Sequence, residues 1–166
     1  VDEALVASAR DALGDGVDLM VDAGRAWNAE TALGRVERFA PYNVFWLEEP
    51  LHPFDVAGYR ELSEHSSIPI AGGEAMTLVE EYADLLQNGK IHFVQPDLGR
   101  VGGISGGLAI EALAKEAGAR AVPHAFGTGI LLSASANWAA VSDQPLTEYT
   151  RAPSPLAQNL AQHEMV

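Results

Sequence analysis

The sequence contains no cysteine, and this absence removes several kinds of chemistry at once. Without thiols the chain can form no disulfide bond, no thiolate nucleophile and no thiolate metal site. A chain of this kind is compatible with the reducing cytoplasm, and we expect a cytoplasmic protein. Any metal site must use oxygen or imidazole ligands.

Basic residues are scarce, with ten Lys and Arg against 23 Asp and Glu, which gives a formal net charge of -13. This balance argues against a nucleic-acid backbone or an anionic membrane as a partner, whereas a bound cation would fit it. Long apolar runs are missing too, since the longest, GILLSASANWAAV, is too short and too polar to span a bilayer. We therefore expect no membrane segment and no signal peptide.

What the 166 residues do contain is an alternation typical of an α/β fold. Segments with helical periodicity, the first over residues 2–13, separate six short runs rich in β-branched or aromatic residues: VDLMVD, VFWLEE, IPIAGGE, IHFVQPD, RAVPH and PLTEY. Strands that alternate with helices pair in parallel, and no linker divides the chain. The length fits one domain with a sizeable core.

Several helix boundaries can be predicted from the sequence. Asn28 is a candidate N-cap, and so is Thr77, which Glu80 follows at capping-box spacing. Gly89 and Gly118 stand where helix C-caps are expected.

A polar or ionisable residue ends each predicted strand, at intervals of 23 to 27 residues: Asp22, Glu48, Glu74, Asp97, His124 and Glu148. In a closed (β/α)8 barrel of the TIM type, the C-terminal ends of successive strands surround one mouth, so this spacing would bring all six side chains together. An open sheet would spread them along an edge. We therefore predict a (β/α)8 barrel present in part, with about six βα units.

The three acids that come first along the chain suggest a metal site. Carboxylates that converge from neighbouring strands repel one another and raise each other's pKa unless a cation lies between them. Oxygen ligands favour Mg²⁺ or Mn²⁺ over Zn²⁺. Of the adjacent pair Glu48 and Glu49 only one can point into the mouth, because strand side chains alternate between faces. The proposed site comprises Asp22, Glu48 and Glu74.

The ordered motifs MVDAG, WLEEP, GGE, VQPDLGRVGG and PHAFG resemble the barrel domain of the mandelate racemase and muconate lactonizing enzyme family, within the enolase superfamily. The resemblance runs from about Leu19 to Glu148. It implies that Asp22, Glu48 and Glu74 bind Mg²⁺ and that Asp97 and His124 form the acid and base pair. It also implies that Glu148 is the electrophilic group beside the substrate carboxylate.

That resemblance implies an activity as well: removal of the proton α to a carboxylate through an enediolate, in a homo-oligomeric enzyme acting on a small carboxylate substrate. The strand ends PD and PH are closer to the mandelate racemase and acid-sugar dehydratase branches than to the muconate cycloisomerase branch. We expect a sugar-acid dehydratase, a type of lyase, with a racemase or epimerase of a 2-hydroxy acid as the alternative.

Two departures from the family pattern weaken the implied activity. The family has Asp-x-Asn at the first metal strand, whereas this sequence has Gly24 two residues after Asp22. The family's Lys-x-Lys motif has no counterpart, since the chain's two lysines, Lys90 and Lys115, are not at predicted strand ends. By the resemblance, residues 1–166 are a partial barrel domain without its first two strands and without the N-terminal capping domain. The alternative that the chain is a non-catalytic fragment therefore stays open. We expect these residues alone to be inactive and prone to association through exposed strand edges.

Other features have two readings each. The glycine-rich GRVGGISGG segment could cradle an anion, but it fits neither a P-loop nor GxGxxG, and we favour tight turning between strand and helix. Arg100 fits a substrate contact and a solvated loop position equally well. Trp27 is interpreted as packing rather than substrate stacking.

Overall fold

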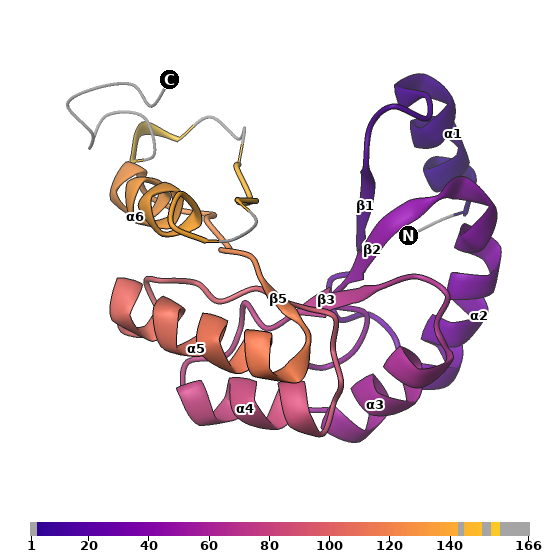
Figure 1. Cartoon of the computed structure of the whole chain (residues 1–166). Helices are drawn as coiled ribbons and strands as arrows, with labels where there is room; N and C mark the ends of the chain where they lie inside the picture. The colour runs from indigo at the N-terminus through magenta and orange to yellow at the C-terminus, as the bar shows by residue number, and fades with distance from the viewer. Residues whose placement is uncertain (1–2, 143–144, 151–153, 157–166) are drawn as a thin grey trace. The chain divides into compact units, whose positions relative to one another are not determined.

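The computed structural model describes residues 3–142, 145–150 and 154–156, and helices and strands alternate along it as predicted (Figure 1). The helices are α1 (Glu3–Leu13), α2 (Ala29–Phe39), the 3-10 helix η1 (Ala40–Tyr42), α3 (Val56–His65), α4 (Val79–Gln87), α5 (Ile104–Ala117) and α6 (Gly129–Ala139). The strands are β1 (Leu19–Asp22), β2 (Val44–Glu48), β3 (Ile70–Gly72), β4 (Phe93–Val94) and β5 (Arg120–Ala121).

The chain divides into two compact units. The first consists of Val1–Gly73 with Asp84–Phe93, and the second of Glu74–Ala83 with Val94–Val166. Strands β1 to β3 lie in the first unit, whereas β5, α5 and α6 lie in the second.

Parallel strands organise the first unit, and their register sets the strand ends side by side. β1 pairs with β2 so that Asp22 lies opposite Glu48, and β2 pairs with β3. Helices α1, α2 and α3 lie on one side of β1 and β2 (Figure 1). Val36, Phe39 and Leu62 on these helices are buried, and burial of such side chains is the main source of stability in this unit.

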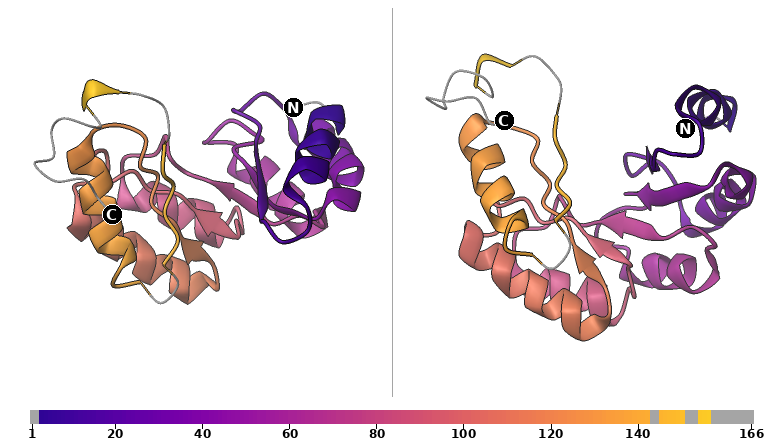
Figure 2. Two further views of the ribbon diagram at one scale, coloured as in Figure 1. Left: turned by 90° about the horizontal axis from the view of Figure 1, so that it is seen from above. Right: turned by 45° about the horizontal axis from the view of Figure 1, so that its top comes forward.

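In the second unit, a parallel pairing and a helix pair hold the chain together. The Val122 N–H donates to the Val94 carbonyl (2.8 Å), which continues β5 alongside the end of β4. α5 and α6 lie side by side (Figure 2), since a Cβ at Gly107 would come within 3.2 Å of the Trp138 ring. The Trp138 Nε1–H donates to Glu111 Oε2 (2.9 Å), which satisfies a buried acid between the helices.

Of the two predicted N-caps, one is confirmed and one is wrong. The Asn28 side chain accepts the Thr31 N–H (2.9 Å), which confirms this cap of α2. Thr77 is not the cap of α4, because the helix begins two residues later. The capping acceptor is the Glu81 carboxylate, which takes the Thr77 N–H at 2.8 Å, and not Glu80.

The predicted C-caps are also divided. Gly118 ends α5 with a φ of +73°, the left-handed conformation that glycine adopts without strain. After α4 the left-handed residue is Lys90 (φ +54°) and not Gly89, so the chain turns one residue later than expected.

The sixth predicted strand, PLTEY, is not assigned as a strand in the described part of the chain. The Glu148 N–H nevertheless donates to the Pro123 carbonyl (3.2 Å), so this segment runs beside the residues that follow β5. A strand requires a repeated ladder of such bonds. The structure therefore contains five strands within the described ranges, and Glu148 lies on an extended connection.

Among the described residues, no helix combines the length and the apolar character needed to cross a membrane.

Candidate active site

In the second unit, Asp97 and His124 lie side by side at the C-terminal ends of β4 and β5. The two residues form an isolated parallel bridge, and the His124 N–H donates to the Pro96 carbonyl at 3.2 Å. Because side chains of bridged residues leave the sheet on the same face, the pairing brings an imidazole and a carboxylate together.

The two side chains form a buried hydrogen-bonded pair. His124 Nδ1 lies 2.8 Å from Asp97 Oδ2, and the two side chains are 9% and 6% exposed. The other oxygen, Asp97 Oδ1, accepts the Gly99 N–H at 2.7 Å, so both carboxylate oxygens are held. A carboxylate acceptor at Nδ1 favours the tautomer with the proton on that nitrogen.

Two further acids lie at Nε2 of the same imidazole. Glu74 Oε2 lies 3.1 Å from His124 Nε2, and Glu148 Oε2 lies 3.7 Å from it. These carboxylate side chains are 22% and 36% exposed, so this end of the ring is the more accessible one. The structure thus gathers four of the six predicted strand-end residues, and the contact between His124 and Glu74 was not predicted.

The other two strand-end acids, Asp22 and Glu48, lie opposite each other in the first unit. Asp22 is exposed, and its Oδ1 accepts the Gly24 N–H at 2.8 Å. Glu48 is half-buried, and its Oε2 accepts from Trp46 Nε1 at 3.1 Å. Two carboxylates at neighbouring parallel strand ends supply the oxygen donors that a hard divalent cation prefers.

Residues 3–142, 145–150 and 154–156 contain no group of three or more His, Asp or Glu side chains arranged to hold a metal ion. Of the three predicted ligands, Asp22 and Glu48 are the two that lie opposite each other on neighbouring strands.

An ion pair with a buried acid lies next to these carboxylates, and the sequence did not predict it. Arg25 Nε is 3.2 Å from Glu49 Oε2, and the Glu49 side chain is only 3% exposed. One signal was available: Glu49 is the acid that alternation turns away from the side of Glu48, and a buried acid needs a cation.

The remaining histidines of the described chain have local structural contacts. His92 Nδ1 accepts the Ile70 N–H at 3.1 Å, and burial lowers the pKa of His92, which favours the neutral ring. His65 Nδ1 lies 2.8 Å from the carbonyl of Glu61, one turn earlier in α3.

The glycine-rich segment makes the turn into α5, as favoured from the sequence. Gly102 and Gly103 have φ values of +85° and +78°, and the Gly103 N–H donates to the Leu98 carbonyl (2.9 Å). Arg100 lies in this turn, half-exposed, with its Nε 4.0 Å from Asp97 Oδ2.

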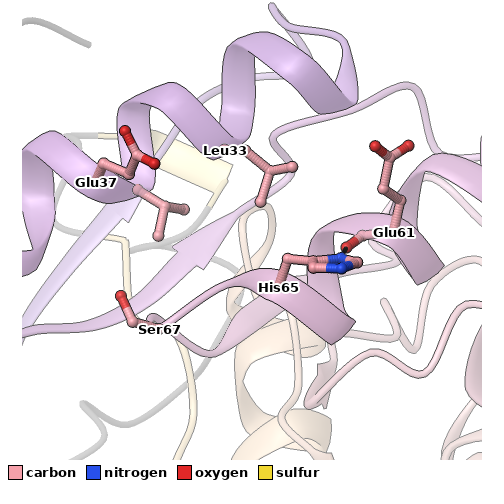
Figure 3. A pocket seen from close by; sticks show the side chains of 6 residues that line it. Leu33, Glu37, Glu61, His65 and Ser67 are labelled. Atoms are coloured by element: carbon pink, nitrogen blue, oxygen red, sulfur yellow. Dashed lines mark hydrogen bonds between the residues drawn. The ribbon is translucent and has the colours of Figure 1, made fainter.

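A surface hollow of about 280 Å³ lies between α2 and α3 (Figure 3). It is lined by Leu33, Val36, Glu37, Glu61, His65 and Ser67, none of which is a predicted site residue.

A family model described as "Enolase C-terminal domain-like" matches residues 1–166. The chain belongs to this family. The predicted membership in the mandelate racemase and enolase superfamily is thereby confirmed.

Three relatives of this enolase-type domain illustrate the likeness. The L-talarate/galactarate dehydratase of Salmonella typhimurium strain LT2 is 43% identical over 115 residues, which cover 69% of this chain and 29% of that protein. The crystal structure of the 3,6-anhydro-D-galactonate cycloisomerase from Zobellia galactanivorans matches with a TM-score of 0.91 and 31% identity, over 96% of this chain and 45% of that one. A crystal structure of an L-talarate/galactarate dehydratase mutant liganded with Mg and L-glucarate matches with a TM-score of 0.77 and 37% identity, over 89% and 37%.

These matches confirm the predicted fold class as an α/β, TIM-type barrel fold present in part. The chain spans less than half the length of each of the three relatives.

Proposed function

We propose that the protein removes the proton α to the carboxylate of a sugar acid with the help of Mg²⁺, and that the reaction is a dehydration. The observation that carries this proposal is the buried imidazole of His124, held at Nδ1 by Asp97 and directed at Nε2 towards the less buried carboxylates of Glu74 and Glu148. This arrangement is typical of a histidine that transfers protons near neutral pH.

The proton transfers follow from the orientation of the ring. Nε2 of neutral His124 accepts the α proton, and the carboxylate of Asp97 stabilises the imidazolium that results. The same Nε2–H can then be given to the hydroxyl on the β carbon, so that the β C–O bond breaks and water leaves. The enol product tautomerises to a 2-keto acid, and His124 is neutral again.

The α proton of a carboxylate is weakly acidic, so negative charge that develops on the substrate carboxyl group must be stabilised. A divalent ion held by Asp22, Glu48 and Glu74 would supply that positive charge. The donor set is all oxygen, which favours Mg²⁺, with Mn²⁺ as a substitute. Glu148 would lie beside the same carboxyl group, since its Oε2 is 3.7 Å from His124 Nε2.

The relatives support a sugar acid as the substrate class. One is named as a dehydratase of L-talarate and galactarate, and a solved dehydratase structure holds Mg and L-glucarate. A solved racemase structure with bound magnesium stands among the structural matches, so racemase or epimerase chemistry at the same carbon is the second candidate.

A panel of aldonic and aldaric acids, incubated with the complete purified protein and Mg²⁺, tests the proposal. We expect at least one acid to yield a keto acid lighter than the substrate by one water, detected by mass spectrometry and by a carbonyl reagent. Chelation of the metal should stop the reaction. An isomer of unchanged mass would identify the epimerase instead, and no conversion of any acid with Mg²⁺ or Mn²⁺ would favour the non-catalytic reading.

A further inference from the structure

We propose that the ion pair between the exposed Arg25 and the buried Glu49 is a clamp between the loops that follow β1 and β2, and that it sets the approach of Asp22 and Glu48. In this assignment Glu49 is a positioning residue and not a metal ligand. The effect on metal binding rests on the proposed function, whereas the effect on the loops does not.

The clamp has two contacts between the same two residues. Arg25 Nε lies 3.2 Å from Glu49 Oε2, and the Arg25 N–H donates to the Glu49 carbonyl at 2.6 Å. Two residues further on, the Trp27 N–H donates to the Pro50 carbonyl at 3.0 Å. The loop after β1 is thus fastened to the loop after β2 through both backbone and side chain.

Both partners have strained backbone conformations. Arg25 has a φ of +64° and Glu49 a φ of +38°, values that residues with a Cβ rarely adopt. Such conformations persist only where surrounding contacts fix them, and they concentrate at functional sites. The strain therefore indicates that contacts of Arg25 and Glu49 fix the backbone here, next to Asp22 and Glu48.

Those neighbours are the two candidate ligands. Glu48 immediately precedes Glu49, and Asp22 precedes Arg25 by three residues through a turn in which the Gly24 N–H binds the Asp22 carboxylate. Asp22 and Glu48 lie opposite each other in register, and the contacts between Arg25 and Glu49 follow directly after them along the two chains. Any shift of the two loops would change the distance between the two carboxylates.

The burial and the contacts of Glu49 hold its carboxylate at Arg25 and away from the candidate metal ligands. Its side chain is 3% exposed, and it raises the pKa of the Tyr59 phenol, an effect second only to the burial of that phenol. The Glu49 N–H donates to the Ala71 carbonyl at 3.0 Å, which ties the clamp to β3 as well. A buried carboxylate held on Arg25 cannot turn towards an ion without leaving its cation.

Hydrogen exchange on the metal-free protein tests the clamp itself. In Glu49→Gln and in Arg25→Gln, amide exchange in residues 23–27 should be at least about tenfold faster than in the wild type, because the loop loses its fastening. Arg25→Lys should restore most of the protection. The matched control is Glu64→Gln, which removes the exposed ion pair with Lys90 in the same unit and should leave these amides unchanged. Unaltered exchange in both Gln variants would overturn the clamp whether or not the protein binds metal.

Mn²⁺ titration of the same variants tests the consequence for the ligands. Each Gln variant should weaken Mn²⁺ binding by roughly 10-fold to 100-fold, the range for residues that orient metal ligands, and the double variant should be no weaker than the single ones. Loss of binding in Glu49→Gln alone, with Arg25→Gln unaffected, would make Glu49 a ligand and overturn the positioning role. Lower thermal stability with unchanged affinity in both variants would show a purely structural pair and would also overturn it. If the wild type bound no Mn²⁺ while the variants still showed faster amide exchange, the result would support the clamp and contradict the proposed function.

Discussion

Replacing His124 by Asn is expected to lower the turnover of the sugar acid by roughly 10²-fold or more, because general acid and base catalysis contributes on that scale. The Asn side chain can still form a hydrogen bond with Asp97, but it has no nitrogen that accepts a proton. Since His124 is assigned no role as a ligand, Mg²⁺ binding should be retained. Steady-state kinetics and a metal titration on the same preparation measure both effects.

The matched control is His65→Asn, which changes an exposed histidine of α3 whose Nδ1 lies 2.8 Å from the Glu61 carbonyl of the same helix. Its turnover should equal that of the wild type. Full activity of His124→Asn across the panel of acids would exclude His124 from both proton transfers.

Mg²⁺ should raise the melting temperature, and this effect should disappear in the double variant Glu48→Gln, Glu74→Gln. A ligand that binds only the folded state at about 100 times its Kd stabilises it by about 2.7 kcal/mol. For a domain of this size that corresponds to a shift of roughly 5 to 10 °C. Thermal unfolding with and without Mg²⁺ measures the shift.

The control for charge is Glu37→Gln, Glu116→Gln, which neutralises two exposed acids on α2 and α5. This variant should keep the full Mg²⁺ shift. If the double variant at Glu48 and Glu74 kept it too, the metal assignment would be wrong.

The alternation of strands and helices could be predicted because it depends on local periodicity. The same holds for the pairing of Asp97 with His124, since residues that end successive parallel strands become neighbours through the topology alone. The prediction of the final strand was wrong. PLTEY has the composition of a strand, but a strand also needs a ladder of hydrogen bonds, which depends on the segment that lies beside it.

The contacts that the sequence did not reveal join side chains from separate loops. The ion pair of Arg25 and Glu49 depends on two left-handed residues, a conformation for which neither arginine nor glutamate has a preference. The contact between Glu74 and His124 Nε2 depends on the side-chain conformation of a residue in a connecting segment. Spacing along the chain specifies which strand ends meet, but not which atoms do.

The most direct measurement follows the fate of the α hydrogen. A sugar acid from the panel, deuterated at the carbon next to the carboxylate, is incubated with the complete purified protein and Mg²⁺ in ordinary water, and deuterium is located by NMR. We expect the label to be released to the solvent at the rate of turnover in the wild type, and roughly 10² times more slowly in His124→Asn. Deuterium retained in the organic product at full turnover would contradict proton abstraction at that carbon.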